Sequence, residues 1–95
     1  MPKLPEGLTL SETGPTYCRD NFPENMKADF KTSEGVWGKV VVAKGMLQFV
    51  VDADGPASRG FLIDPMFPGI VAPGLSHSLS PAMGDVEFYI EYYSA

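Results

Sequence analysis

The sequence predicts an all-β fold made of short antiparallel strands. Short runs rich in β-branched and aromatic residues recur along the chain, and ten Gly and nine Pro residues separate them as turns. Helical periodicity is nearly absent, and residues 21–27 predict only a single helical turn. About eight short strands without helices to cover parallel crossovers require antiparallel pairing. We therefore expect a jelly-roll barrel, which leaves few free strand edges.

Composition limits the domain organisation and the partners. A length of 95 residues, with 44% hydrophobic and 12% aromatic residues, predicts a single globular domain over residues 1–95, in which residues 1–6 are disordered. The net charge of −5 and the scattered Lys and Arg predict no nucleic-acid partner and no membrane surface as partner. No apolar run approaches the roughly 20 residues that span a bilayer, so we expect a cytoplasmic protein. Cys18 stands alone, which excludes a disulfide within the chain.

The strongest strand signals lie in the middle of the chain. Residues 36–43 and 46–52 flank Lys44-Gly45 and predict a β-hairpin with a tight turn at that dipeptide. Residues 54–56 predict the next turn, and residues 58–63 a returning strand.

Three further strands are predicted near the end of the sequence. Residues 69–72 form a short apolar run before Pro73-Gly74, residues 77–80 form another before Pro81, and residues 86–93 form the last strand. Alternation in this last strand predicts one face with Val86, Phe88, Ile90 and Tyr92 and a second face with Glu87, Tyr89, Glu91 and Tyr93. The Tyr residues on the second face predict that it meets a partner subunit or lines a cavity.

Several segments resemble a known family. Residues 32–49 look like the signature hairpin of the small cupin-like domains of the tellurite-resistance TehB/YeaR-like family, and residues 73–93 resemble the closing half of the same domain. Gly69, Pro73 and His77 look like a shortened form of the second cupin motif, in which the His points into the barrel as a metal ligand. The resemblance implies a cupin-like jelly-roll barrel, also called a double-stranded β-helix, and a homodimer.

One difference from the family bears on metal binding. Members commonly have a His five residues before the Gly that stands here as Gly35, and this chain has Phe30 there. His77 is then the one His available as a metal ligand, whereas metal centres usually need three protein ligands. We therefore leave the cofactor open and expect a divalent metal to be held weakly at most.

Four residues are candidates for ligand binding: His77, Glu91, Trp37 and Thr32. Glu91 either faces His77 across the barrel or lies in solvent or at an interface, and His77 either contacts a ligand or bonds to backbone or water. Trp37 is either core or the floor of a pocket. Thr32 could offer a hydroxyl to an oxyanion, as Lys39 or Arg59 could offer a cation. Replacing His77 by Ala is expected to abolish binding and to change stability by no more than about 1 to 2 kcal/mol.

Three functions remain open on the sequence alone. The first is a domain that binds a polar or anionic small molecule and is linked to tellurite or oxyanion stress resistance. The second is an enzyme in which His77 and Glu91 act together, with or without a weakly held metal. The third is a dimeric interaction module whose barrel is filled by side chains such as Phe30 and Leu75. A cavity that exposes His77 would favour the first two functions.

Overall fold

The computed structural model describes residues 3–27, 30–51 and 58–95 and confirms the all-β class. The strands form one antiparallel sheet in the order β1-β6-β3-β4, with β2 beside β6 and β5 beside β3. The sheet is not closed, so the predicted jelly-roll barrel is not observed. In the described residues no helix is long and apolar enough to cross a bilayer. The elements are β1 (Thr9–Thr13), β2 (Tyr17–Cys18), the 3-10 helix η1 (Glu24–Lys27), β3 (Trp37–Val51), β4 (Arg59–Ile63), β5 (Gly69–Val71) and β6 (His77–Ser94).

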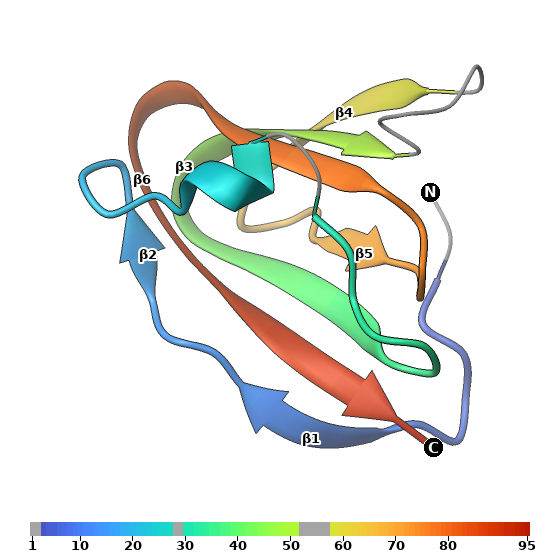
Figure 1. The fold of residues 1–95 in the computed structure, drawn as a ribbon. Helices are drawn as coiled ribbons and strands as arrows, with labels where there is room; N and C mark the ends of the chain where they lie inside the picture. The colour runs from blue at the N-terminus through green and yellow to red at the C-terminus, as the bar shows by residue number, and fades with distance from the viewer. Residues whose placement is uncertain (1–2, 28–29, 52–57) are drawn as a thin grey trace.

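Two long strands organise the sheet. β3 and β6 run antiparallel along their whole length and bend together, as Figure 1 shows. Trp37 pairs with Tyr93 at one end of this ribbon, and Val51 pairs with His77 at the other. β5 extends the sheet beside the first part of β3 and β4 beside the second, whereas β1 and β2 flank the later part of β6. The bend turns the two halves of the sheet toward each other.

The bend in β3 replaces the predicted hairpin, so the turn predicted at Lys44-Gly45 is wrong. The register between β3 and β6 shifts between Val42 and Leu47, and the buried positions change from even to odd numbers there. Such a bulge adds residues to one strand and bends it. Gly45 has a φ of 82°, and a Cβ on it would collide with the carbonyl oxygen of Asp85 on β6. The two-residue hairpin turns of types I′ and II′ and the G1 type of bulge both use a Gly with positive φ, which is why the dipeptide suggested a turn.

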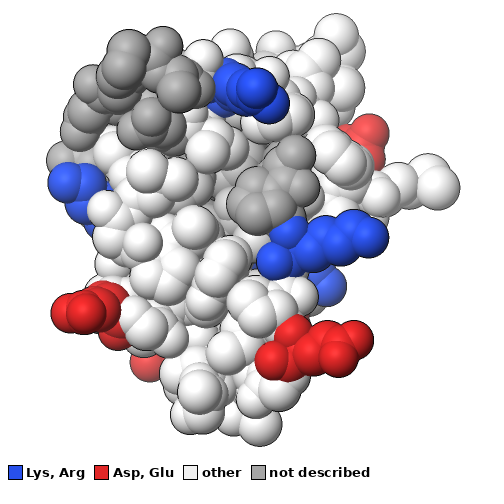
Figure 2. Space-filling view, turned by 90° about the vertical axis from the view of Figure 1, so that its right-hand side faces the viewer, with Lys and Arg blue, Asp and Glu red and all other residues white. Residues whose placement is uncertain are grey.

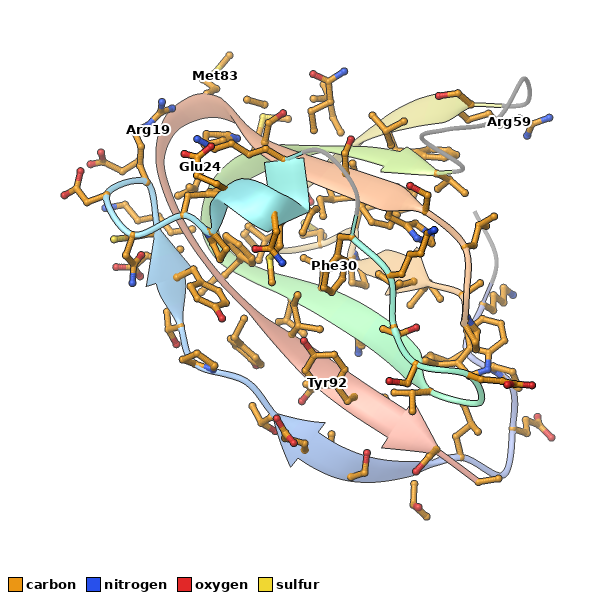
Figure 3. All side chains as sticks on the ribbon, viewed as in Figure 1. Arg19, Glu24, Phe30, Arg59, Met83 and Tyr92 are labelled. Atoms are coloured by element: carbon orange, nitrogen blue, oxygen red, sulfur yellow. The ribbon has the colours of Figure 1, made fainter. Side chains whose placement is uncertain are left out.

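β6 joins two segments that were predicted as separate strands. Pro81 lies in the bend, opposite Leu47, and does not end the strand. The Arg19 guanidinium donates hydrogen bonds of 2.8 and 3.2 Å to the carbonyl of Gly84 and so braces the bend, where Figure 3 shows Arg19 beside Met83. The described part of the chain therefore has six strands where about eight were expected.

The other predicted elements have mixed outcomes. The strands predicted at 58–63 and 69–72 are observed as β4 and β5, and the predicted helical turn is observed as η1. β1 and β2 were not predicted. The turn at 54–56 lies outside the described residues, as do residues 1–2 of the segment predicted to be disordered, while residues 3–5 have no regular secondary structure.

The core lies between the two halves of the bent sheet. The Phe22 and Phe88 rings lie 5.2 Å apart, and Met26 of η1 is buried against the same cluster. Since apolar burial is the main favourable term in folding, these contacts hold the halves together. The fully buried apolar side chains come from both parts of β3 and of β6 and from β4 and β5: Val40, Leu47, Phe49, Ile63, Val71, Leu79, Val86, Phe88 and Ile90.

We predict that Gly45→Ala destabilises the fold far more than Gly84→Ala. Both glycines have positive φ, but a Cβ at Gly84 would meet no atom within 4 Å, whereas at Gly45 it would strike backbone. We expect Gly84→Ala to cost about 1 to 2 kcal/mol and Gly45→Ala about 3 kcal/mol or more. Urea unfolding followed by the fluorescence of Trp37 measures both. Equal losses would contradict the assignment of Gly45 to a tightly packed bulge.

Candidate functional site

His77 lies in the core and its side chain is fully buried. Its ring stacks on Phe49 with the centroids 5.3 Å apart and the planes at 20°. Nδ1 lies 2.6 Å from the carbonyl oxygen of Leu75, and because a carbonyl only accepts, Nδ1 carries the hydrogen and donates it. His77 also exchanges two backbone hydrogen bonds with Phe30, of 2.7 and 2.9 Å. His77 therefore joins the segment around Phe30 to the sheet.

Glu91 and Trp37 lie on the opposite face of the sheet. Glu91 alternates with the inward-facing Ile90 and Tyr92, and its carboxylate accepts a 3.0 Å hydrogen bond from the Tyr93 hydroxyl. Trp37 pairs with Tyr93 on this outer face. Of the two alternatives left open for Glu91, the structure therefore agrees with the one in which the carboxylate does not face His77. Trp37, which is partly exposed, lies on the same outer face and away from His77.

The residues present do not fit a metal centre around His77. Nδ1 is engaged as a donor, and Glu91 points to the other face of the sheet. Phe30, whose backbone pairs with His77, has a side chain without a ligand atom. Within the described residues no group of three or more His, Cys, Asp or Glu side chains is arranged to hold a metal ion.

A groove remains beside the core, and it contains one of the predicted site residues, Thr32. This groove, called here the β1 groove, has a volume of about 320 Å³ and lies between β1, the segment 30–36 and the C-terminal part of β6. Figure 3 shows Phe30 and Tyr92 coming from different elements toward this space. The lining residues are Ser11, Glu12, Phe30, Lys31, Thr32, Ser33, Val36 and Tyr92.

Hydrogen bonds within and beside the segment 30–36 shape the wall of the β1 groove. The Thr32 hydroxyl donates to the carbonyl of Val36 at 2.6 Å, and the Val36 amide donates to the carbonyl of Ser33 at 3.0 Å. The Gly74 amide donates to the carbonyl of Thr32 at 3.4 Å. The segment is thus a closed turn fixed at Phe30 and at Gly74. Since its one hydrogen is used, the Thr32 hydroxyl can offer only acceptor positions to a ligand.

Tyr92 supplies a donor to the groove. Burial, helped by the phenol of Tyr17 and the carboxylate of Glu12, raises the pKa of Tyr92 above its usual value of 10.0. The phenol therefore stays protonated at neutral pH and keeps its O–H hydrogen. The Ser11 hydroxyl is already engaged, since it donates to the backbone carbonyl of Tyr92 at 3.1 Å.

Charge in the groove is balanced between one cation and one carboxylate. Lys31 and Glu12 are the charged side chains of its lining.

On the side of the molecule that Figure 2 shows, basic and acidic groups lie apart with uncharged surface between them. Arg59, suggested by the sequence as a possible cation, is the first residue of β4 and lies away from Phe30 (Figure 3). Lys39 lies on the outer face, opposite Glu91.

The sequence reasoning missed most of the groove. Tyr92 had a usable signal, because alternation in the last strand placed it on the same face as the apolar Val86, Phe88 and Ile90 and its hydroxyl is polar. Ser11 and Glu12 had no signal, because the pairing of β1 with β6 joins residues about 80 positions apart, as in the bond from Ser11 to Tyr92.

The comparison with protein families gives a clear result. The profile of the TehB-like domain family matches residues 12–90. The chain belongs to the TehB-like domain family. The matched range of this TehB-like domain includes the segment 30–36 and His77 but ends before Tyr92. A search of curated proteins gives no match.

Solved structures share the fold of this TehB-like domain. A protein from E. coli strain K12 superposes with a TM-score of 0.85 at 18% identity, covering 100% of this chain and 98% of that chain, and this likeness shows the fold alone. TehB from Haemophilus influenzae superposes with a TM-score of 0.79 at 26% identity, covering 94% of this chain. The alignment covers 32% of that TehB chain, so this chain spans about a third of its length.

We predict that His77→Ala lowers the free energy of unfolding by about 2 to 4 kcal/mol. The sequence suggested a smaller loss, but removing the ring takes away a fully buried side chain, its stacking on Phe49 and its bond to Leu75. Ser78→Ala, at the neighbouring position whose side chain points away from the core, is the control and should change stability by less than about 0.5 kcal/mol. Chemical denaturation measures both, and equal small losses would contradict a structural role for His77.

We predict that stability falls as the pH rises past about 10, and that Tyr92→Phe reduces this fall. The pKa of Tyr92 is raised in the folded protein, so the unfolded chain loses this proton at a lower pH and is then favoured. The stabilisation is present below the unfolded pKa and disappears as the pH rises through the folded one. Denaturation at a series of alkaline pH values measures it, and identical slopes for the wild type and Tyr92→Phe would contradict it.

Proposed function

We propose that this TehB-like domain binds a small polar or anionic molecule in the β1 groove. The observation that carries the proposal is the lining of the groove, which combines the Tyr92 phenol and the Ser33 hydroxyl with apolar walls from Phe30 and Val36. The Lys31 ammonium and the Glu12 carboxylate, also in the lining, add one charge of each sign. Small-molecule sites are typically concave, partly apolar and equipped with a few polar groups that fix orientation. The volume of about 320 Å³ lies at the small end of the usual range for such sites.

The rigidity of the groove wall supports the proposal. Phe30 is fixed by its two backbone hydrogen bonds to His77, and Thr32 is fixed by its bond to Val36. A preformed wall lowers the cost of ordering side chains when a ligand binds. The His77 side chain is fully buried and does not line the β1 groove, so the criterion of a cavity that exposes His77 is not met. His77 instead contributes to the proposed site by positioning Phe30, and we do not expect it to touch the ligand.

The family suggests which ligand to test first. Resemblance to tellurite-resistance proteins of the TehB/YeaR type makes tellurite, an oxyanion, the first choice, and a role in resistance to oxyanion stress is part of the proposal. We also propose that the open, bent sheet is related to the cupin-like jelly roll, with the β1 groove at its open edge. A reaction is not part of the proposal, because His77 and Glu91 point to opposite faces of the sheet.

We predict that tellurite titrated into isotope-labelled protein shifts the amide signals of residues 11–12, 30–33, 36 and 92. Tyr92→Phe removes one donor and should weaken binding about 2- to 12-fold, the equivalent of a hydrogen bond of about 0.5 to 1.5 kcal/mol. Tyr89→Phe makes the same chemical change on the outer face and should leave the affinity unchanged. Sulfate provides a second anionic probe.

Two results would contradict the proposal. One is the absence of shifts at groove residues with either probe at millimolar concentration. The other is an affinity that Tyr89→Phe lowers as much as Tyr92→Phe does.

A further inference from the structure

One face of the sheet exposes aromatic side chains next to a pair of opposite charges. It consists of Trp37, Lys39 and Val41 on β3 and Tyr89, Glu91 and Tyr93 on β6, and these six residues are called the outer face from here on. All six remain partly exposed in the described structure. Three are large aromatics, and aromatic residues are enriched at interfaces between proteins.

Cross-strand pairing arranges the outer face in three rows. Trp37 lies opposite Tyr93, Lys39 lies opposite Glu91, and Val41 lies opposite Tyr89. The two charges thus occupy the middle row, with apolar and aromatic side chains on either side. Both charged residues lie in the described part of the chain, and no ion pair within 4.0 Å joins them there.

We propose that a second copy of this chain packs against the outer face, related by a twofold axis that runs parallel to β3 and β6 and between them. Two identical faces can pack against each other only if the twofold axis lies in the plane between them. With the axis along the strands, each residue of β6 meets the residue of the partner's β3 that it pairs with in its own chain. Glu91 then contacts the partner's Lys39, and Tyr93 contacts the partner's Trp37.

The charge pattern selects this axis over the alternative. A twofold axis across the strands, through the middle row, would place Glu91 against the partner's Glu91 and Lys39 against the partner's Lys39. Like charges facing each other across an interface are costly, whereas opposite charges are favourable. The axis along the strands forms the Glu91 to Lys39 contact twice, because every contact of such an interface occurs in two copies.

The geometry of the sheet agrees with this packing. Facing sheets with nearly aligned strands lie about 10 Å apart, a distance that Trp and Tyr side chains fill. The hydrogen bond from the Tyr93 hydroxyl, 3.0 Å long, holds the Glu91 carboxylate on this face. The proposal is independent of the β1 groove, because the groove residue Tyr92 points to the other side of β6.

Charge reversal tests the contact between Glu91 and Lys39. Sedimentation equilibrium should show a wild-type dimer, and Lys39→Glu or Glu91→Lys alone should weaken it at least tenfold, since each variant places like charges against each other twice. The double variant Lys39→Glu/Glu91→Lys should regain the dimer. Mixing the two single variants in equal amounts should form a heterodimer, because one protein then presents only acidic groups in the middle row and the other only basic groups.

The mixing experiment separates the interface from effects within one chain. Each single variant also creates a like-charge pair across its own strands, and mixing two proteins cannot relieve that repulsion. Lys44→Glu is the matched control, because Lys44 pairs with Glu87 on the same two strands but outside the outer face. It should leave the dimer unchanged, and circular dichroism confirms that each variant is folded.

Three results would overturn the proposal. The first is a wild-type protein that stays monomeric at several hundred micromolar, which would mean that another partner or none covers the outer face. The second is a dimer that both single variants leave intact. The third is a mixture of the single variants that remains monomeric.

Discussion

The bend shared by β3 and β6 is the constraint on which the rest of the structure depends. A single six-stranded sheet must enclose its own core here, because η1, of four residues, is the one helix in the described chain. The ribbon of β3 and β6 achieves this by bending at facing bulges, where Gly45 leaves room for the backbone of Asp85. Each bulge also exchanges the inward and outward positions of its strand, so that Val42 before the bend and Leu47 after it both face the core.

The bend also explains where a ligand can and cannot be held. Inside the fold the space is filled by side chains such as Phe49, Phe88 and His77, which are fully buried. Space remains where the sheet stops short of closing, between β1 and the segment fixed by Phe30. His77 therefore has a structural role in this fold. Its ring packs in the core while its backbone holds the wall of the β1 groove.

The sequence predicted well which short segments form strands and which residues share a face, and it predicted poorly which strands pair with each other. Alternation assigned the two faces of residues 86–93, and burial of Val86, Phe88 and Ile90 confirms it. The predicted hairpin was wrong because the dipeptide Lys44-Gly45 is compatible with both a hairpin turn and a bulge. What distinguishes the two is that both flanking segments pair with β6 and not with each other. Within the site, Thr32 was identified, whereas Ser11 and Glu12 reach the groove only through β1 pairing with β6. The two alternatives for Glu91 could not be separated from the sequence, because His77 lies beyond the bulge of β6, which exchanges inward and outward positions.

The topology has a consequence for how the chain acquires its structure. Every strand of the sheet pairs with either β3 or β6, and the outermost pairing joins Thr9 to Ser94, 85 positions apart. During synthesis, β1, β2 and β3 leave the ribosome well before their common neighbour β6 exists. Folding dominated by such distant pairings is slow, because the chain between the paired strands must lose conformational entropy before the stabilising contacts form. The edge of β3 that pairs with β6 therefore stays open until β6 has been synthesised, and during this interval the nascent chain is most exposed to aggregation.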